Sequence, residues 1–206
     1  MTKEKLLRWS GMAGLVSGVL LILLEIAFFG AFGDQPERVA AATSAWLVLL
    51  DLSLVAAYMG LLALIGLYAR QTQESGGLGF AGFILASIGW VMNIGFLWAG
   101  AFIIPALTSA APDFLDRVET DPPGIVAVGF ISTFAIFAVG WVIFGIGSLK
   151  AGILPRAGTW LVILGALLSL VGSFVGLPFS GILFGLGLAM LGRWLWSERP
   201  SISAEV

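Results

Sequence analysis

Six long, unbroken runs of apolar residues constrain the fold of this 206-residue chain more than any other feature. A helix that crosses a bilayer needs about 20 mostly apolar residues. The runs lack the apolar–polar alternation of transmembrane β-strands, and helices satisfy their own backbone hydrogen bonds in lipid. The sequence therefore predicts an all-α fold, a polytopic transmembrane bundle of six helices in a single domain covering residues 1–206. The predicted spans are residues 9–30, 46–68, 79–104, 124–149, 158–176 and 181–196.

The composition agrees with a chain embedded in lipid and excludes several classes of function. Hydrophobic residues make up 59% of the chain and charged residues 11%, with a mean hydropathy of +1.05. Soluble domains are about 45–50% apolar and about 25% charged. The chain has no cysteine and no histidine, so it lacks the usual ligands of zinc, haem and iron–sulfur clusters. We expect no metal site, no cofactor and, with a net charge of −2, no nucleic-acid partner.

Motifs that carry catalysis are also lacking from the sequence. There is no histidine to activate a serine and no cysteine nucleophile. A glycine-rich phosphate loop with its lysine is absent as well. We therefore do not expect an enzyme.

The distribution of lysine and arginine predicts the orientation of the bundle, because positively charged loops stay in the cytoplasm. With six crossings, only Arg38 and Arg117 of the ten basic residues fall on the outer side. Both termini are therefore predicted to be cytoplasmic, and the chain to be a multi-pass protein of a bacterial plasma membrane. The first apolar run is about twice as long as a signal-peptide core and contains Glu25, so we expect a retained helix.

The outer loops are acidic and contain two local helix signals. Pro36 follows Asp34 as a helix start follows its cap, which predicts that the second helix begins outside the membrane, near Pro36. Residues 112–118 place three apolar side chains on one side of a turn or two, as a short interfacial helix does. We interpret the acidic residues beside it as a solvated loop rather than a calcium site.

Glycines and deep tryptophans predict how the helices pack. The pairs Gly14/Gly18 and Gly181/Gly185 are each separated by three residues, a spacing that lets helix backbones approach closely. We interpret both as packing positions within the bundle rather than as a dimer motif. Tryptophans near the ends of the runs fit membrane interfaces, and those deeper in the runs are interpreted as packing residues: Trp90, Trp98 and Trp141.

Two carboxylates lie inside the apolar runs. Glu25 is five residues before Gly30, and Asp51 is five residues after Trp46, so both lie about 7–8 Å below the outer interface at a helix rise of about 1.5 Å per residue. Their helices are joined by a short connection and are expected to be neighbours. The two acids can therefore share one layer and one site. The other polar side chains expected in that layer are Ser53, Asn93, Ser132 and Thr133.

This polar layer has two interpretations. In one, Glu25 and Asp51 form a proton or cation site in a cavity that opens outward, since ionisable residues inside membranes commonly serve function. In the other, each acid is neutral and hydrogen-bonds to a neighbouring helix or reaches the interface, because desolvation disfavours the charged form. The sequence leaves both interpretations open.

The stretch GSLKAGILPRAGTWLVILGALLSLVGSF resembles the turn between helices four and five in a group of uncharacterised bacterial six-helix integral membrane proteins. DLSLVAAYMGLLALIGLYAR, with an acid early in helix two, is also similar to that group. The resemblance implies the six-helix topology and supplies no activity. The residues that carry the turn are Lys150, Gly152, Ile153, Leu154, Pro155 and Arg156.

Two classes of function follow from these observations. The first is an accessory or structural subunit, or a helical bundle that binds a lipophile. Its partners would be the lipid bilayer and either other membrane subunits or a bound lipophilic molecule. The alternative is a small proton- or cation-coupled membrane carrier that uses Glu25 and Asp51.

Overall fold

The computed structural model describes residues 2–33, 35–175 and 181–198, and this part of the chain is all-helical, with no strand. The prediction of an all-α fold is therefore confirmed for the described residues. Their helices are α1 Lys3–Phe32, α2 Glu37–Ala41, α3 Ser44–Gln71, α4 Gly76–Phe102, α5 Ile104–Ala110, α6 Pro112–Thr120, α7 Gly124–Ala151, α8 Arg156–Val175 and α9 Ile182–Ser197.

Among the described residues, four helical segments are long and apolar enough to cross a membrane. They are α1, α3, α7 and the continuous segment Gly76–Ala110, which joins α4 to α5. The apolar parts of α8 and α9 are shorter, at Arg156–Gly172 and Ile182–Ser197. These helices agree with a membrane-associated protein, while six crossings stay a prediction. The last residue of the predicted span 158–176 lies outside the described residues.

Local signals in the sequence explain several helix ends. The Thr43 hydroxyl accepts a hydrogen bond from the Trp46 N–H at 3.3 Å and caps the start of α3. The helix α7 ends at Ala151, and the residue that caps it, Gly152, has a left-handed φ of +69°. The expectation of one continuous helix from Pro36 was wrong, because this cap separates the short α2 from α3. A short helix is present over the expected residues 112–118, as α6, and its interfacial position stays a prediction.

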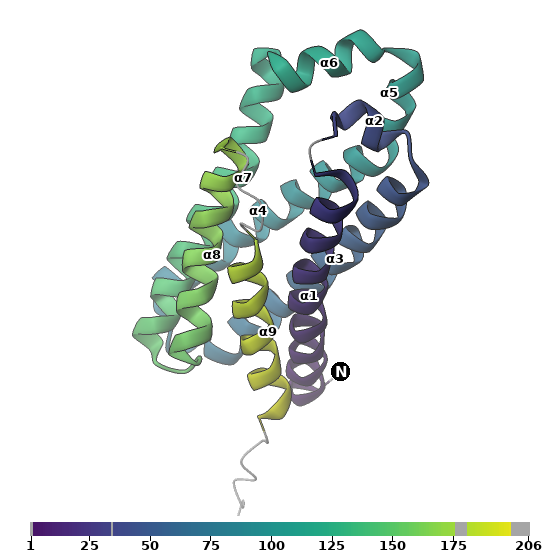
Figure 1. Ribbon diagram of the computed structural model, residues 1–206. Helices are drawn as coiled ribbons and strands as arrows, with labels where there is room; N and C mark the ends of the chain where they lie inside the picture. Colours follow the sequence, from purple (N-terminus) through teal and green to yellow (C-terminus); the bar gives the residue numbers. More distant parts are fainter. Residues whose placement is uncertain (1, 34, 176–180, 199–206) are drawn as a thin grey trace, which may run out of the picture.

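The six longest helices form a closed ring in the order of the sequence (Figure 1). Each of them packs against the next: α1 on α3, α3 on α4, α4 on α7, α7 on α8, and α8 on α9. The ring closes because α9 packs back against α1. The start of α1 and the end of α9 lie at the same end of the ring, which we call the terminal end.

The short helices α2, α5 and α6 lie together at the opposite end of the ring and form what we call the cap (Figure 1). An exposed ion pair, Arg38 Nε to Asp116 Oδ1 at 3.0 Å, joins α2 to α6 within the cap. Leu115 of α6 is buried. The cap therefore ties the connection after α1 to the connection before α7.

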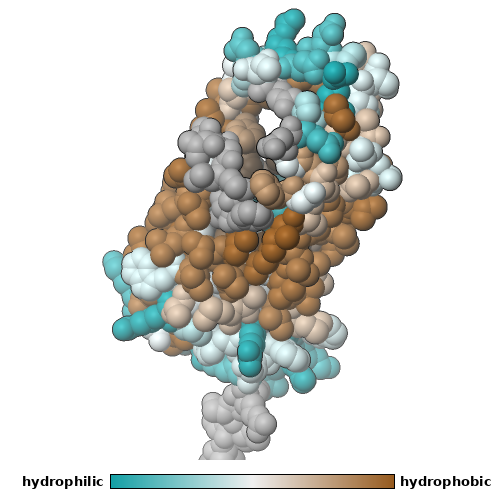
Figure 2. All heavy atoms as spheres, in the orientation of Figure 1, coloured by the Kyte–Doolittle hydropathy of each residue, from teal (hydrophilic) through white to brown (hydrophobic). Residues whose placement is uncertain are grey.

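The surface between the cap and the terminal end is apolar (Figure 2). Large apolar side chains point outward from several ring helices, among them Val48, Val91, Val139 and Leu164. Hydrophilic residues gather at the two ends of the molecule. This belt is the surface that a lipid-embedded bundle presents.

Glycines set the close contacts between helices in the half of the ring nearer the terminal end. A Cβ added to Gly18 of α1 would collide with the α9 backbone at Gly185 and Ala189. A Cβ added to Gly14 would meet the Cα of Gly192 at 3.1 Å. The prediction that Gly14, Gly18 and Gly185 pack within the bundle is therefore confirmed.

Candidate functional site

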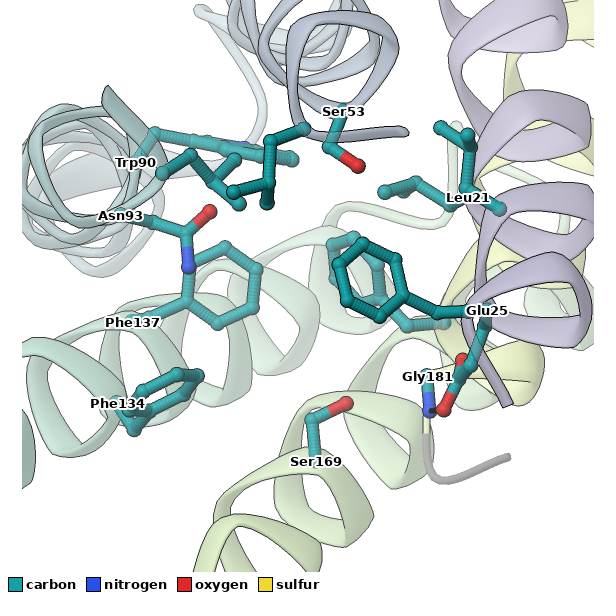
Figure 3. A pocket seen from close by; sticks show the side chains of 14 residues that line it. Leu21, Glu25, Ser53, Trp90, Asn93, Phe134, Phe137, Ser169 and Gly181 are labelled. Atoms are coloured by element: carbon teal, nitrogen blue, oxygen red, sulfur yellow. Dashed lines mark hydrogen bonds between the residues drawn. The ribbon is translucent and has the colours of Figure 1, made fainter. Parts of the chain in front are cut away.

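A cavity of about 350 Å³ lies inside the ring, in the half nearer the cap. We call it the central cavity. Most of the side chains that line it are aliphatic or aromatic (Figure 3). All six helices of the ring border it, through residues that include Leu21 and Glu25 of α1, Ser53 of α3, Asn93 of α4, Phe137 of α7, Ser169 of α8 and Phe184 of α9.

An aromatic cluster forms the side of the cavity that faces the terminal end. Trp90, Phe137 and Phe184 line the cavity, and Trp141 packs behind them, fully buried, with its ring centroid 5.1 Å from that of Phe184. The Trp90 and Phe137 rings meet edge to face, with their centroids 5.2 Å apart. We call these four residues the aromatic floor. It separates the central cavity from the glycine-packed half of the ring.

A second aromatic group lies toward the cap. Phe28, which lines the cavity, stands edge to face with Trp46 at a centroid distance of 5.3 Å. The Trp46 indole N–H donates to the Gly100 carbonyl oxygen at 2.9 Å, which joins α3 to α4. The cavity therefore lies between two aromatic groups, each supported by more than one helix.

Glu25 is the acidic residue in the wall of the cavity, and its carboxylate lies at the start of α9 (Figure 3). The backbone N–H of Gly181 donates to Glu25 Oε1 at 2.9 Å. This N–H belongs to the residue that precedes α9, where backbone donors have no partner within the helix. The partial positive charge of a helix N-terminus also stabilises a nearby carboxylate.

Gly181 permits this contact because it has no side chain. A Cβ at this position would stand 2.7 Å from Glu25 Oε2, closer than real Cβ contacts allow. Any other residue would therefore push the end of the Glu25 side chain away from α9. The contact between Glu25 and Gly181 also joins the first and last helices of the ring.

Three further polar side chains point into the cavity from α3, α4 and α8: Ser53, Asn93 and Ser169 (Figure 3). The Ser53 hydroxyl donates its proton to the Leu49 carbonyl oxygen at 2.8 Å. Its oxygen consequently faces the cavity as an acceptor. Asn93 presents an amide, with one acceptor and two donors. The predicted polar layer thus contributes Glu25, Ser53 and Asn93 to one cavity.

Asp51 does not reach this cavity, so the expected common site for Glu25 and Asp51 is not present. Leu50 and Ser53 line the cavity, whereas Asp51 lies on the exposed face of α3. Each residue turns an α-helix by about 100°, so Asp51 points away from its two cavity-lining neighbours. The sequence pattern places the two carboxylates at similar depths, but Glu25 faces the central cavity and Asp51 faces the outer surface of the ring.

Ser132 and Thr133 are also outside the cavity lining. Ser132 is partly exposed and Thr133 is buried. Both hydroxyls donate to the Gly129 carbonyl oxygen of their own helix, at 3.0 and 2.8 Å. The hydroxyl groups of these two predicted site residues therefore form their hydrogen bonds within α7.

The aromatic lining of the cavity was not predicted from the sequence. Trp90 and Trp141 are buried, as expected of packing residues, but Trp98 is 50% exposed, so the expectation of packing was wrong for Trp98. The positions 90, 93 and 97 repeat at helical spacing. Read together with the tryptophan at 90 and the asparagine at 93, that spacing could have identified the inward face of α4.

The terminal end has a different, polar hollow of about 1010 Å³. Its lining carries charges of both signs, with Lys3, Lys5 and Arg8 beside Glu4. The remaining charged pair in it is bidentate: Arg70 donates to both carboxylate oxygens of Glu198, at distances of 2.6–3.0 Å. This hollow is a charged surface of the helix ends. It lacks the mainly apolar lining of the central cavity.

No cluster of three or more acidic side chains that could hold a metal ion occurs among the described residues. Comparison with known proteins adds no assignment, because no protein-family model, curated protein or solved structure matches the chain. The resemblance to uncharacterised bacterial six-helix membrane proteins stays a prediction. The function must therefore be argued from the central cavity itself.

Proposed function

We propose that this chain is an integral membrane protein that binds a small lipophilic molecule in the central cavity. The observation that carries the proposal is an apolar hollow of about 350 Å³ bordered by all six ring helices. Binding sites for small molecules are concave spaces of about 300–1,000 Å³ with mostly apolar walls and a few polar groups. A hollow of this size and lining is large enough to hold a small molecule.

The proposed setting is a bacterial plasma membrane, with α1, α3, α4, α7, α8 and α9 crossing it. The apolar belt around the ring supports this placement (Figure 2). The position of eight of the ten basic residues, at what would be the inner side, supports cytoplasmic termini. In this orientation the cap and the central cavity lie toward the outer surface.

We infer binding rather than catalysis, and an accessory role for the protein. Glu25 stands among apolar walls, and the chain offers no histidine or cysteine to act beside it. The exposed apolar belt could also contact other membrane subunits. Both the lipophile and such subunits would be found by the same purification.

A proton- or cation-coupled carrier is the alternative, and Glu25 is the residue that still supports it. Its carboxylate lines the cavity, is half-buried and is placed at a helix start. Asp51 lies outside the cavity, so a carrier would depend on Glu25 and not on the pair. Flux that is lost in Glu25→Gln and kept in Asp51→Asn would favour this alternative.

The proposed function is tested by purifying the protein from its native membrane in a mild detergent and identifying bound molecules by mass spectrometry. We expect a lipophile in a fixed ratio to the protein. Asn93→Phe should remove it, because the added ring would fill the cavity, while Val91→Phe should not. Val91 is on the same helix but is 58% exposed, which makes it the matched control.

Two outcomes would contradict the proposal. One is a protein that carries only bulk lipid in variable amounts. The other is a bound molecule that persists unchanged when Asn93→Phe fills the cavity. Partner subunits that arrive in a fixed ratio, with no bound lipophile, would support the accessory role alone.

A further inference from the structure

We propose that the molecule bound in the central cavity is an organic cation, an amine that is protonated or quaternary and carries an apolar body. This inference rests on the proposed function and names the chemical class of the ligand. It follows from the charge of the cavity, its aromatic walls and the kind of hydrogen-bonding groups that it presents.

The first argument is the unbalanced charge of Glu25. The sequence contains no lysine or arginine between Arg8 and Arg38, between Arg38 and Arg70, or between Arg156 and Arg193. The stretches 75–112 and 122–149, which supply α4 and α7, contain no charged residue. The ring therefore has no cationic side chain of its own at the depth of the Glu25 carboxylate.

The contact with α9 compensates for only part of this charge. The start of a helix carries roughly half a positive charge, supplied here through the Gly181 N–H. A neutral lipophile that filled the cavity would displace water from the carboxylate without replacing its interactions, which is costly. A cationic ligand would supply the missing countercharge while its apolar body filled the remaining space.

The second argument is the aromatic character of the walls. Among the described residues, five aromatic side chains line the cavity: Phe28, Trp90, Phe134, Phe137 and Phe184. Cations bind to the faces of aromatic rings, and cages of such rings recognise quaternary ammonium groups. The Nε1 atom of Trp90 is buried without a hydrogen-bond partner among the described residues, and the part of Trp90 that lines the cavity adds to its aromatic wall.

The third argument is that the wall presents oxygen acceptors from three different helices. Glu25 contributes carboxylate oxygens, and Ser53 faces the cavity as an acceptor because its proton is donated to Leu49. Asn93 adds one carbonyl oxygen from the opposite side (Figure 3). A protonated amine brings donors for these oxygens, whereas a quaternary ammonium, which has no N–H, would be held by its charge and by the aromatic rings. A carboxylate or phosphate ligand would be repelled by Glu25.

The test compares two probes of the same shape, benzyltrimethylammonium and its uncharged analogue neopentylbenzene, in which carbon replaces the nitrogen. Binding to the full chain in phosphatidylcholine nanodiscs is measured by calorimetry against empty nanodiscs. Glu25→Gln removes the charge and keeps an oxygen that can accept from Gly181. Asp51→Asn makes the same change on the exposed face of α3 and serves as the control.

We expect the wild-type protein to bind the ammonium probe more tightly than the uncharged probe. Glu25→Gln should weaken binding of the ammonium probe by about tenfold or more, the loss expected when a charged partner is removed. It should leave binding of the uncharged probe unchanged, which also shows that the variant is folded. Asp51→Asn should change neither affinity.

Failure of this inference and failure of the proposed function give different results. If both probes bind equally and Glu25→Gln changes nothing, the cavity binds lipophiles without regard to charge, and the inference is overturned. If neither probe binds above empty nanodiscs, the proposed function fails together with the inference.

Discussion

The two halves of the ring are built from the same helices but differ in how closely those helices approach. In the half nearer the terminal end, α1, α4 and α7 place glycines against neighbouring backbones: Gly11, Gly14, Gly18, Gly82, Gly140 and Gly147. In the half nearer the cap, the inward positions carry leucine, phenylalanine and tryptophan, and the helices enclose the central cavity. Side-chain size along each helix therefore decides where the ring is closed and where it is hollow.

Two glycines in the cap half, Gly95 and Gly129, do not have this packing role. A Cβ added to Gly95 of α4 or Gly129 of α7 would meet no atom within 4 Å. On the same helices, a Cβ on Gly82 or Gly140 would collide with the backbone of the facing helix. The comparison teaches that glycine content alone does not locate helix contacts in this chain. Contacts form only where an added Cβ would meet a facing helix, as at Gly82 and Gly140.

The largest expected effect comes from breaking the aromatic floor, which separates the two halves. Phe184 is buried and its ring contacts Trp90, Phe137 and Trp141. Phe184→Ala should destabilise the protein by about 3 kcal/mol, the low end for such truncations, because lipid also solvates apolar side chains in the unfolded state. The measurement is thermal unfolding in detergent. A change no larger than that of Val91→Ala, on the exposed face of α4, would show that the floor is not a packing unit.

The second prediction sharpens the comparison on a single helix. Gly82→Ala places a Cβ against the Phe144 backbone of α7 and should cost about 1–3 kcal/mol through overpacking. Gly95→Ala, in open space on the same α4, should be neutral or slightly stabilising, since alanine favours helix by about 1 kcal/mol over glycine. The measurement is the unfolding temperature of each variant, which should be lower for Gly82→Ala than for Gly95→Ala. Equal temperatures would contradict the difference between the halves.

The smallest expected effect compares the ion pairs at the two ends. Arg70 and Glu198 form a bidentate pair in which each side chain is 29% exposed, whereas Arg38 and Asp116 share one contact and are 44% and 51% exposed. Glu198→Gln should cost about 1 kcal/mol, and Asp116→Asn less, because exposed pairs contribute about 0–1 kcal/mol. Unfolding at low and at high salt provides the measurement. A larger loss for Asp116→Asn would reverse the predicted order.

Much of the fold could be predicted from the sequence because length and hydropathy determine where helices form in such a chain. Glu25 could be identified because a lone carboxylate inside an apolar run is conspicuous. The orientation of Asp51 could not be predicted, since its depth is fixed by helix rise but its direction by rotation about the helix axis. Spacing along the chain constrains the depth of a residue much better than the direction in which its side chain points.

The aromatic walls were missed for a related physical reason. In a soluble protein, polar residues mark the outward face of a helix and leave an apolar stripe inward. Here lipid and interior are both apolar, so α4 carries Val91 outward and Trp90 inward without a polar signal to distinguish them. The contact between Glu25 and Gly181 was also beyond sequence reasoning, because it joins residues 156 positions apart.

The closure of the ring between α1 and α9 has a consequence for biosynthesis. The glycine face of α1 leaves the ribosome first, but its partner on α9 is among the last segments to be translated. Until then α1 has only α3 beside it, and Glu25 has not met Gly181. The central cavity therefore comes into being only when translation is nearly finished. A chain released early would keep most of its helices and have no enclosed site.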